Sequence, residues 1–149
     1  MLLCDSNVWL AIALSKHIHH RSARDWLDSV EEPNSVLFCR ATQQSFLRLL
    51  TNASVLRPYG NPPLTNRQAW SVMEDLLGDD RIVLRAEEPA GLEARWKKLA
   101  LRDDASTKLW MDAYLAAFAM ASGHRMVTTD SAFRQFEGLA LEVLGDPGT

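Results

Sequence analysis

The sequence has little cysteine, no long apolar run and no excess of positive charge. Its two cysteines, Cys4 and Cys39, lie in short apolar stretches typical of buried strands, where a free thiol behaves as a small hydrophobic group. No apolar run approaches the roughly 18 residues of a membrane span, and no basic leader precedes Leu2. The net charge of −3 excludes a uniformly basic nucleic-acid binder, although a local basic patch remains compatible with it. These absences predict a cytoplasmic protein with no membrane partner and no signal peptide.

Several motifs of well-defined enzyme and zinc-binding classes are also missing. The sequence has no Gly-rich phosphate loop, no His-Glu-x-x-His metalloprotease motif and no set of cysteines spaced for zinc. It has no internal repeat and no linker that separates two folded parts. Because 47% of the residues are hydrophobic and five are tryptophan, the chain is expected to form one packed domain over residues 1–149.

Short apolar segments alternate with amphipathic ones along the whole chain. Strands are predicted at residues 2–4, 36–39, 82–84, 126–128 and 140–143. Helices are predicted at residues 8–14, 19–30, 42–50, 66–77, 89–101 and 107–122, with a long loop at 57–63. Such alternation implies right-handed crossovers, and so an α/β sandwich with a parallel sheet of about five strands and helices on both faces.

Three aspartates occupy related positions in this predicted sheet. Asp5 ends the first strand, Asp130 ends the fourth, and Asp112 lies early in the helix that leads into the fourth strand. In a parallel sheet these positions share the carboxyl edge, where ligands of open α/β sheets bind. The three carboxylates are therefore expected to converge.

Each aspartate also has an ordinary structural explanation. Asp5 suits a helix N-cap, Asp130 suits a turn, and Asp112 is favoured by the dipole of its helix. Their convergence is harder to explain in this way, since crowded carboxylates repel one another unless a cation joins them. Mg²⁺ or Mn²⁺ prefers such oxygen ligands, and a water activated by the metal would hydrolyse a phosphodiester.

The motifs around these acids resemble those of a known family. The similarity is to PIN domains, and specifically to the VapC toxins of bacterial toxin–antitoxin systems, and it covers essentially the whole chain. The acidic motifs that carry it are Leu3–Ala11 (LCDSNVWLA), Trp110–Ala119 (WMDAYLAAFA) and Val127–Phe133 (VTTDSAF). Two further segments resemble one branch of these toxins: His17–Ala23 (HIHHRSA) and Phe38–Gln43 (FCRATQ).

The resemblance implies a function and a set of site residues. Asp5, Asp112 and Asp130 would bind Mg²⁺ or Mn²⁺, Asn7 would support Asp5 through side-chain hydrogen bonds, and Asn7 and Gln43 would orient the site. The implied activity is that of a PIN-like three-layer sandwich that cleaves RNA as an endoribonuclease. A cognate VapB-like antitoxin would restrain it, and a homodimer is expected because dimers are common in the family.

One position departs from the family pattern. PIN domains usually carry a further acid, commonly Glu, at the start of the third helix, where this chain has Gln43, or Gln44 if the register shifts by one. An amide has no charge and is a poor base, so metal binding should be weaker. An alternative follows: a PIN domain that binds antitoxin or RNA without efficient cleavage. A phosphohydrolase of another α/β fold, with Asp5 as nucleophile, is a third hypothesis.

Basic residues and histidines provide secondary candidates. Arg40 follows the second strand and is expected to contact substrate phosphate, and Arg48 is a weaker candidate for the same role. Three histidines in the link after the first helix are expected to be structural or solvated: His17, His19 and His20. Four basic residues, interrupted by acids, are best explained as an exposed helix face: Lys97, Lys98, Arg102 and Lys108.

Overall fold

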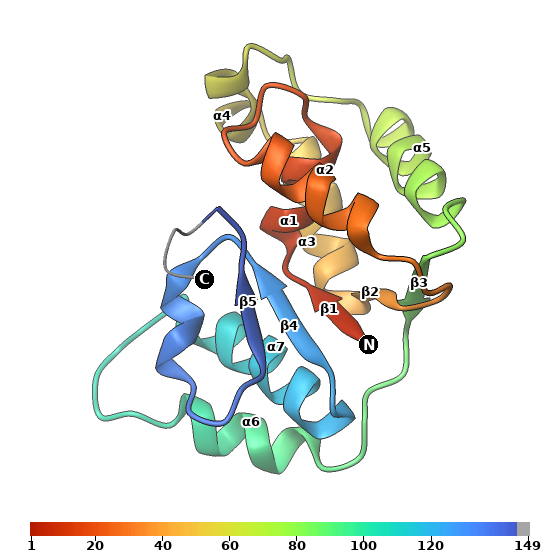
Figure 1. Cartoon of the computed structure of the whole chain (residues 1–149). Helices are drawn as coiled ribbons and strands as arrows, with labels where there is room; N and C mark the ends of the chain where they lie inside the picture. Colours follow the sequence, from red (N-terminus) through yellow and green to blue (C-terminus); the bar gives the residue numbers. More distant parts are fainter. Residues whose placement is uncertain (146–149) are drawn as a thin grey trace.

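A parallel sheet separates two layers of helices in the computed structural model, which describes residues 1–145 (Figure 1). The sheet has five strands in the order β3-β2-β1-β4-β5, and every neighbouring pair is parallel. This architecture confirms the predicted α/β sandwich. Within residues 1–145, no helix has both the length and the apolar content needed to cross a membrane. The elements are β1 (Leu2–Cys4), α1 (Ser6–Ala13), α2 (His20–Ser29), β2 (Val36–Cys39), α3 (Arg40–Leu50), α4 (Ala53–Leu56), the 3-10 helix η1 (Arg57–Tyr59), α5 (Asn66–Leu77), β3 (Ile82–Arg85), α6 (Leu92–Ala100), α7 (Leu109–Ser122), β4 (Arg125–Thr128), the 3-10 helix η2 (Ser131–Gln135) and β5 (Leu141–Val143).

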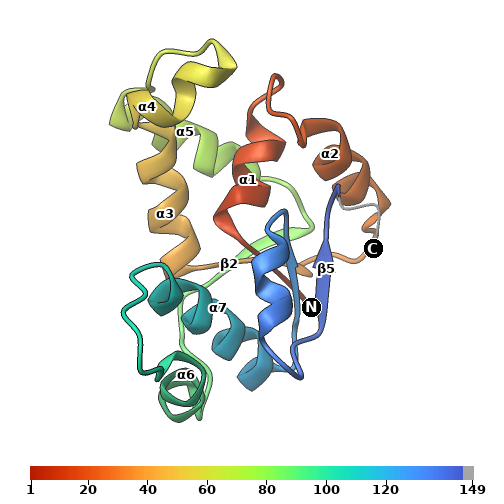
Figure 2. The same cartoon turned by 90° about the vertical axis from the view of Figure 1, so that its left-hand side faces the viewer.

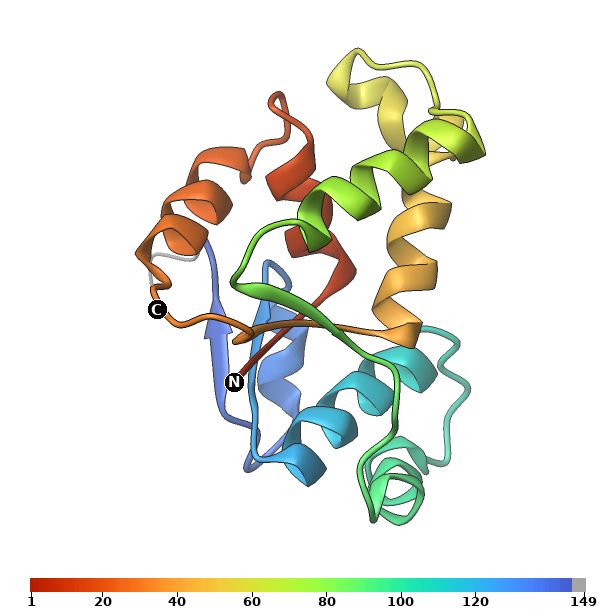
Figure 3. The ribbon, with the colours of Figure 1, turned by 90° about the vertical axis from the view of Figure 1, so that its right-hand side faces the viewer.

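The two faces of the sheet bury different side chains of the same strands. Leu3 and Leu37 pack with α6 and α7, whereas Cys4 and Phe38 pack with α1, α2, α3 and α5. Successive strand side chains point to opposite faces, so a strand covered on both sides reads as a continuous apolar run. Figures 2 and 3 show the resulting layers, with α6 and α7 below the sheet and α1 to α5 above it.

One helix begins later than its sequence predicts. The proline at position 89 favours a helix start, yet α6 begins at Leu92. Gly91 lies directly before it with φ 81°, a left-handed conformation that an α-helix cannot contain. The glycine therefore delays the helix, and residues 89–91 form a turn.

The segment after α3 is more ordered than predicted. The helix α4 was not expected, and η1 occupies the start of the segment 57–63 that was predicted as a loop. The side-chain oxygen of Asn52 accepts hydrogen bonds from the backbone N–H groups of Ser54 and Val55 at 2.9 and 3.2 Å, which satisfies the first turn of α4. The helix α3 also begins at Arg40, immediately after β2, rather than at Thr42.

The three histidines have structural surroundings, as predicted. A ring nitrogen of His20 lies 2.7 Å from the carbonyl oxygen of Ala11, which ties α2 to α1. His17 stacks on Tyr59 with ring centroids 4.8 Å apart. His17 also accepts a hydrogen bond from the backbone N–H of His19. The histidines thus connect α1, α2 and η1.

Candidate functional site

Asp5 forms the buried floor of the candidate site. It follows β1 directly, and its backbone N–H donates to the carbonyl of Val127 at 2.9 Å, which continues the pairing of β1 with β4. The side chain is only 7% exposed. One carboxylate oxygen accepts a hydrogen bond from Thr128 Oγ1 at 3.0 Å, and the other accepts one from Ser6 Oγ at 3.4 Å. Asp5 stands at the N-cap position of α1, but its side chain makes no capping bond, so capping does not explain this aspartate.

The surroundings of Asp5 favour its neutral form. Burial, together with the nearby charges of Asp112 and Asp130, raises the pKa of Asp5 from 3.8 to about 6, despite the opposing hydrogen bond from Thr128. The two distant acids therefore lie close enough to repel a charge on Asp5. A carboxylate held under this repulsion is poised to bind a cation.

Lys108 lies between the other two acids. Its ammonium is 2.5 Å from Oδ2 of Asp130 and 3.5 Å from Oδ2 of Asp112. Asp112 follows Lys108 by four residues, which is about one helical turn. Burial raises the pKa of Asp112, whereas hydrogen bonds from Lys108 and from the N–H of Ala132 hold the pKa of Asp130 below its usual range despite partial burial. The bond from Ala132 is the turn contact that Asp130 was expected to make if it were structural. One carboxylate oxygen of Asp130 therefore stabilises the turn, and the other pairs with Lys108 beside Asp112.

Two residues of this site were missed or misassigned in the sequence. The sequence analysis assigned Lys108 to an exposed basic helix face, but its ammonium pairs with Asp112 and Asp130 instead. The spacing of four residues between Lys108 and Asp112 was the available signal. Thr128 is fully buried, and its hydroxyl donates to Asp5 and accepts from the backbone N–H of Asp130 at 3.0 Å. A hydroxyl at the end of an otherwise apolar strand was the signal for Thr128.

Gln43 lies at the carboxyl edge in the first turn of α3, as the sequence predicts. It is 5% exposed, and its side-chain oxygen accepts a hydrogen bond from the guanidinium of Arg40 at 2.6 Å. Gln44 is exposed. The buried position therefore belongs to Gln43, and Arg40 is engaged with this amide.

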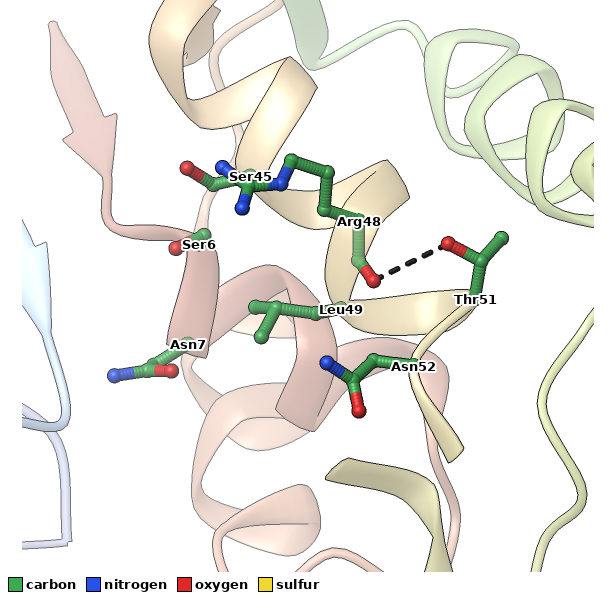
Figure 4. Close-up of a pocket in the computed structure, with 7 residues that line it drawn as sticks. All are labelled: Ser6, Asn7, Ser45, Arg48, Leu49, Thr51 and Asn52. Carbon is green, nitrogen blue, oxygen red and sulfur yellow. Dashed lines mark hydrogen bonds between the residues drawn. The ribbon is translucent and has the colours of Figure 1, made fainter. Parts of the chain in front are cut away.

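Asn7 does not make the hydrogen bond to Asp5 that the resemblance implied. Ser6 and Thr128 supply the side-chain bonds to that carboxylate, and Asn7 is exposed on the first turn of α1. Asn7 instead lines a cavity of about 520 Å³ between α1 and α3 (Figure 4). The remaining lining residues are Ser6, Ser45, Arg48, Leu49, Thr51 and Asn52.

The three aspartates have the chemistry of a cation site, although their carboxylates are not grouped tightly enough to surround one ion. Within residues 1–145, no three His, Cys, Asp or Glu side chains are grouped closely enough to ligate a metal ion. Asp112 and Asp130 nevertheless share one positive charge, the ammonium of Lys108, beside the buried carboxyl of Asp5. Hard carboxylate oxygens are the donors that Mg²⁺ and Mn²⁺ prefer, so the chemistry of these residues suits either ion.

Comparison with known proteins places this arrangement in a family. The PIN domain family matches residues 2–139, so the chain belongs to the PIN-domain proteins, and the hypothesis of a different phosphohydrolase fold is set aside. Within that family it belongs with the VapC ribonucleases. It is 59% identical over 144 residues to Ribonuclease VapC41 of Mycobacterium tuberculosis (strain ATCC 25618 / H37Rv), across 97% of this chain and 99% of that protein. It is 31% identical over 139 residues to Ribonuclease VapC31 of the same strain, across 91% and 93% of the two chains.

Solved structures share the fold at low sequence identity. VapBC2 from Rickettsia felis, bound to a DNA fragment from its promoter, superposes with a TM-score of 0.67 at 16% identity and covers 96% of this chain and 98% of that chain. VapC20 from Mycobacterium tuberculosis, a toxin that cleaves the sarcin–ricin loop, gives a TM-score of 0.61 at 20% identity over 91% and 94% of the two chains. These likenesses confirm the PIN-like architecture.

Proposed function

We propose that this protein is a Mg²⁺- or Mn²⁺-dependent endoribonuclease and the toxin of a toxin–antitoxin pair. The observation that carries the proposal is the sharing of one cation, Lys108, by Asp112 and Asp130 beside the buried Asp5. Membership among the VapC ribonucleases supports RNA as the substrate. Asp5, Asp112 and Asp130 would hold the metal.

Each residue of the site has a separate role in the proposed hydrolysis. A divalent cation held by Asp5, Asp112 and Asp130 would supply Lewis acidity toward a phosphate oxygen and would lower the pKa of a water molecule. The hydroxyl of Thr128 holds the carboxylate of Asp5 and the backbone N–H of Asp130 in fixed positions, because it bonds to both. Lys108, which is paired with Asp112 and Asp130 in the metal-free chain, would be free to contact a phosphate oxygen if a metal took its place. Asn7 and Gln43 would orient the site from the first turns of α1 and α3, and Arg40, which donates a hydrogen bond to Gln43, would contact the substrate phosphate.

The partners follow from the family and from one apolar surface. Solved VapBC assemblies with this fold support a VapB-like antitoxin as the protein partner, and the site of action is the cytoplasm, where both partners and RNA meet. Trp110 and Met111 are 55% and 44% exposed on the first turn of α7, next to a cavity of about 290 Å³ that Trp96 and Tyr114 help to line. A second copy of the chain would cover this surface in a homodimer.

The alternative function is binding without efficient cleavage. It is favoured by the uncharged Gln43, whose oxygen is already engaged by Arg40. Loss of a carboxylate lowers the charge available to a divalent cation. Under this alternative the protein would bind antitoxin or RNA but hydrolyse RNA very slowly.

Cleavage of RNA by the purified protein separates the two functions. The wild type is expected to cut RNA with Mg²⁺ or Mn²⁺ and to stop when the metal is chelated. Asp5→Asn should lose at least about a hundredfold in rate, in line with the removal of one electrostatic group from a catalytic site. Equal cleavage by wild type and Asp5→Asn would contradict the metal mechanism, and RNA binding without cleavage would favour the alternative.

A further inference from the structure

We propose that the cavity between α1 and α3 is a subsite for a backbone phosphate of the RNA strand, next to the phosphate that is cut. The inference rests on the proposed ribonuclease function, which it extends to a specific binding residue, Arg48. Ser6 lines the cavity, and its hydroxyl donates a hydrogen bond to the carboxylate of the buried Asp5 at 3.4 Å. A strand bound with its scissile phosphate at Asp5 would therefore reach the cavity past Ser6.

The walls of the cavity come from two packed helices and the turn that follows. Ser6 and Asn7 belong to the first turn of α1, and Ser45 and Arg48 lie along α3. The volume of about 520 Å³ lies within the range usual for ligand pockets. Figure 4 shows the side chain of Arg48 extending along α3 toward Ser45 and Ser6.

The guanidinium of Arg48 is uncommitted. Arg48 is exposed, and among residues 1–145 no side-chain hydrogen bond or ion pair engages its guanidinium; only its backbone carbonyl accepts, from Thr51. This separates it from Arg40, which is tied to Gln43, and from Lys108, which is tied to Asp130. A free planar fork of N–H donors matches two oxygens of a phosphate.

The other lining groups favour an anion as well. None of the lining residues within the described part of the chain is acidic, although the protein carries a net charge of −3. The oxygen of Asn52 is occupied by the N–H groups of α4, which leaves its amide NH₂ as a donor toward the cavity side. Hydroxyl and amide donors together with one guanidinium are the groups that commonly contact phosphate and sugar.

A nucleic-acid strand fits these walls better than a protein segment does. A peptide helix in a groove requires a row of apolar anchors, and among the described residues that line the cavity Leu49 is the single aliphatic one. Phosphate recognition requires positive charge and hydrogen-bond donors in an open site, and the lining of this cavity supplies both. Specificity for a base is not implied, because phosphate contacts position a strand without reading its sequence.

Binding of a short single-stranded RNA of mixed sequence tests the subsite. Fluorescence anisotropy of the labelled RNA would be measured on the full chain in an Asp5→Asn background, so that cleavage does not consume the probe. Arg48→Gln is compared with Arg125→Gln, which removes the same charge at the amino end of β4, on the opposite edge of the sheet. Arg48→Lys and Ser45→Glu are added, since the first keeps the charge without the fork and the second places a carboxylate in the cavity.

We expect Arg48→Gln to weaken RNA binding about tenfold, as for loss of one charge-assisted contact, and to reduce the salt slope by about 0.7. Arg48→Lys should lose less, Ser45→Glu at least as much, and Arg125→Gln almost nothing. Equal effects of Arg48→Gln and Arg125→Gln would overturn the subsite while leaving the ribonuclease proposal intact. If Arg48→Gln spares RNA but weakens binding of poly-glutamate, the cavity takes an acidic protein and the proposal is wrong. A wild type that binds RNA through Arg48 without cutting it with metal would refute the ribonuclease function alone.

Discussion

The ammonium of Lys108 lies 2.5 Å from a carboxylate oxygen of Asp130, and the same group lies 3.5 Å from one of Asp112. A side chain thus supplies the positive charge that crowded carboxylates require. Lys108 is itself 65% exposed, so it can leave without disturbing the core. Its place between the acids makes it a competitor of any metal ion that binds there.

Removal of this lysine is expected to strengthen metal binding. In Lys108→Gln the acids keep their charge and lose their internal partner, so Mn²⁺ should bind about fivefold more tightly, a change typical of one partly exposed ion pair. Isothermal titration calorimetry measures the affinity directly. Lys97→Gln, on the exposed face of α6, is the matched control. Weaker or unchanged Mn²⁺ affinity in Lys108→Gln would show that Lys108 does not compete with the metal.

Thr128 is expected to matter through its hydroxyl rather than its shape. Thr128→Val keeps the volume but leaves the buried Asp5 without its 3.0 Å donor and the N–H of Asp130 without its acceptor. The free energy of unfolding should fall by about 1–3 kcal/mol, as when a buried polar group loses its partner. Urea denaturation measures this loss, and Thr128→Ser should retain most of the stability. Equal losses in both variants would mean that the hydrogen bonds of the hydroxyl stabilise the fold no more than the packing of the methyl group does.

The burial of Asp5 predicts an unusual pH dependence of stability in the metal-free protein. Its pKa is about 6 when folded and 3.8 in the reference state, so the folded chain binds more protons between these values and loses stability as the pH rises through them. Asp5→Asn removes this penalty. Its gain over wild type in chelator should be larger at pH 7 than at pH 4, by about 2 kcal/mol at most.

Urea midpoints at the two pH values provide the measurement. Asp104→Asn serves as the comparison, because Asp104 is ion-paired with Arg102 on the surface and its pKa is lowered by that guanidinium. The same Asp5→Asn gain at both pH values would mean that Asp5 is ionised without penalty in the folded protein.

Gln43→Glu tests whether the uncharged amide limits the site. The new carboxylate would be held by Arg40, as the amide oxygen is now at 2.6 Å, so the fold should be retained. One more negative charge near the acids should raise Mn²⁺ affinity and the rate of RNA cleavage, each by severalfold. Gln44→Glu, exposed one position later, is the control. If only Gln44→Glu raises the two quantities, the register assumed for the family position is wrong.

The sequence was sufficient for the sheet and for the position of the acids, because both follow from local patterns. Leu2–Cys4 and Val36–Cys39 are continuous apolar runs that end at polar residues, and this pattern identifies a strand buried on both faces and its carboxyl end. The helix start at Leu92 was not predicted, since it depends on the left-handed backbone of Gly91.

The contacts within the site were harder to predict because they join residues that are far apart in the chain. Thr128 meets Asp5 across 123 positions, and Lys108 meets Asp130 across 22, so neither pairing leaves a local pattern. The partners of Asn7 were equally hidden: it was expected to bond Asp5, but Ser6 and Thr128 make those bonds and Asn7 is among the residues that line the cavity.

Calorimetric titration with Mn²⁺ tests most directly whether the three aspartates form one metal site. The wild type should bind the ion, and Asp5→Asn, Asp112→Asn and Asp130→Asn should each weaken binding by about tenfold or more, since each removes one charged ligand. Asp104→Asn, exposed and paired with Arg102, should bind as the wild type does. Absence of binding at millimolar Mn²⁺, or an equal loss in Asp104→Asn, would contradict the account.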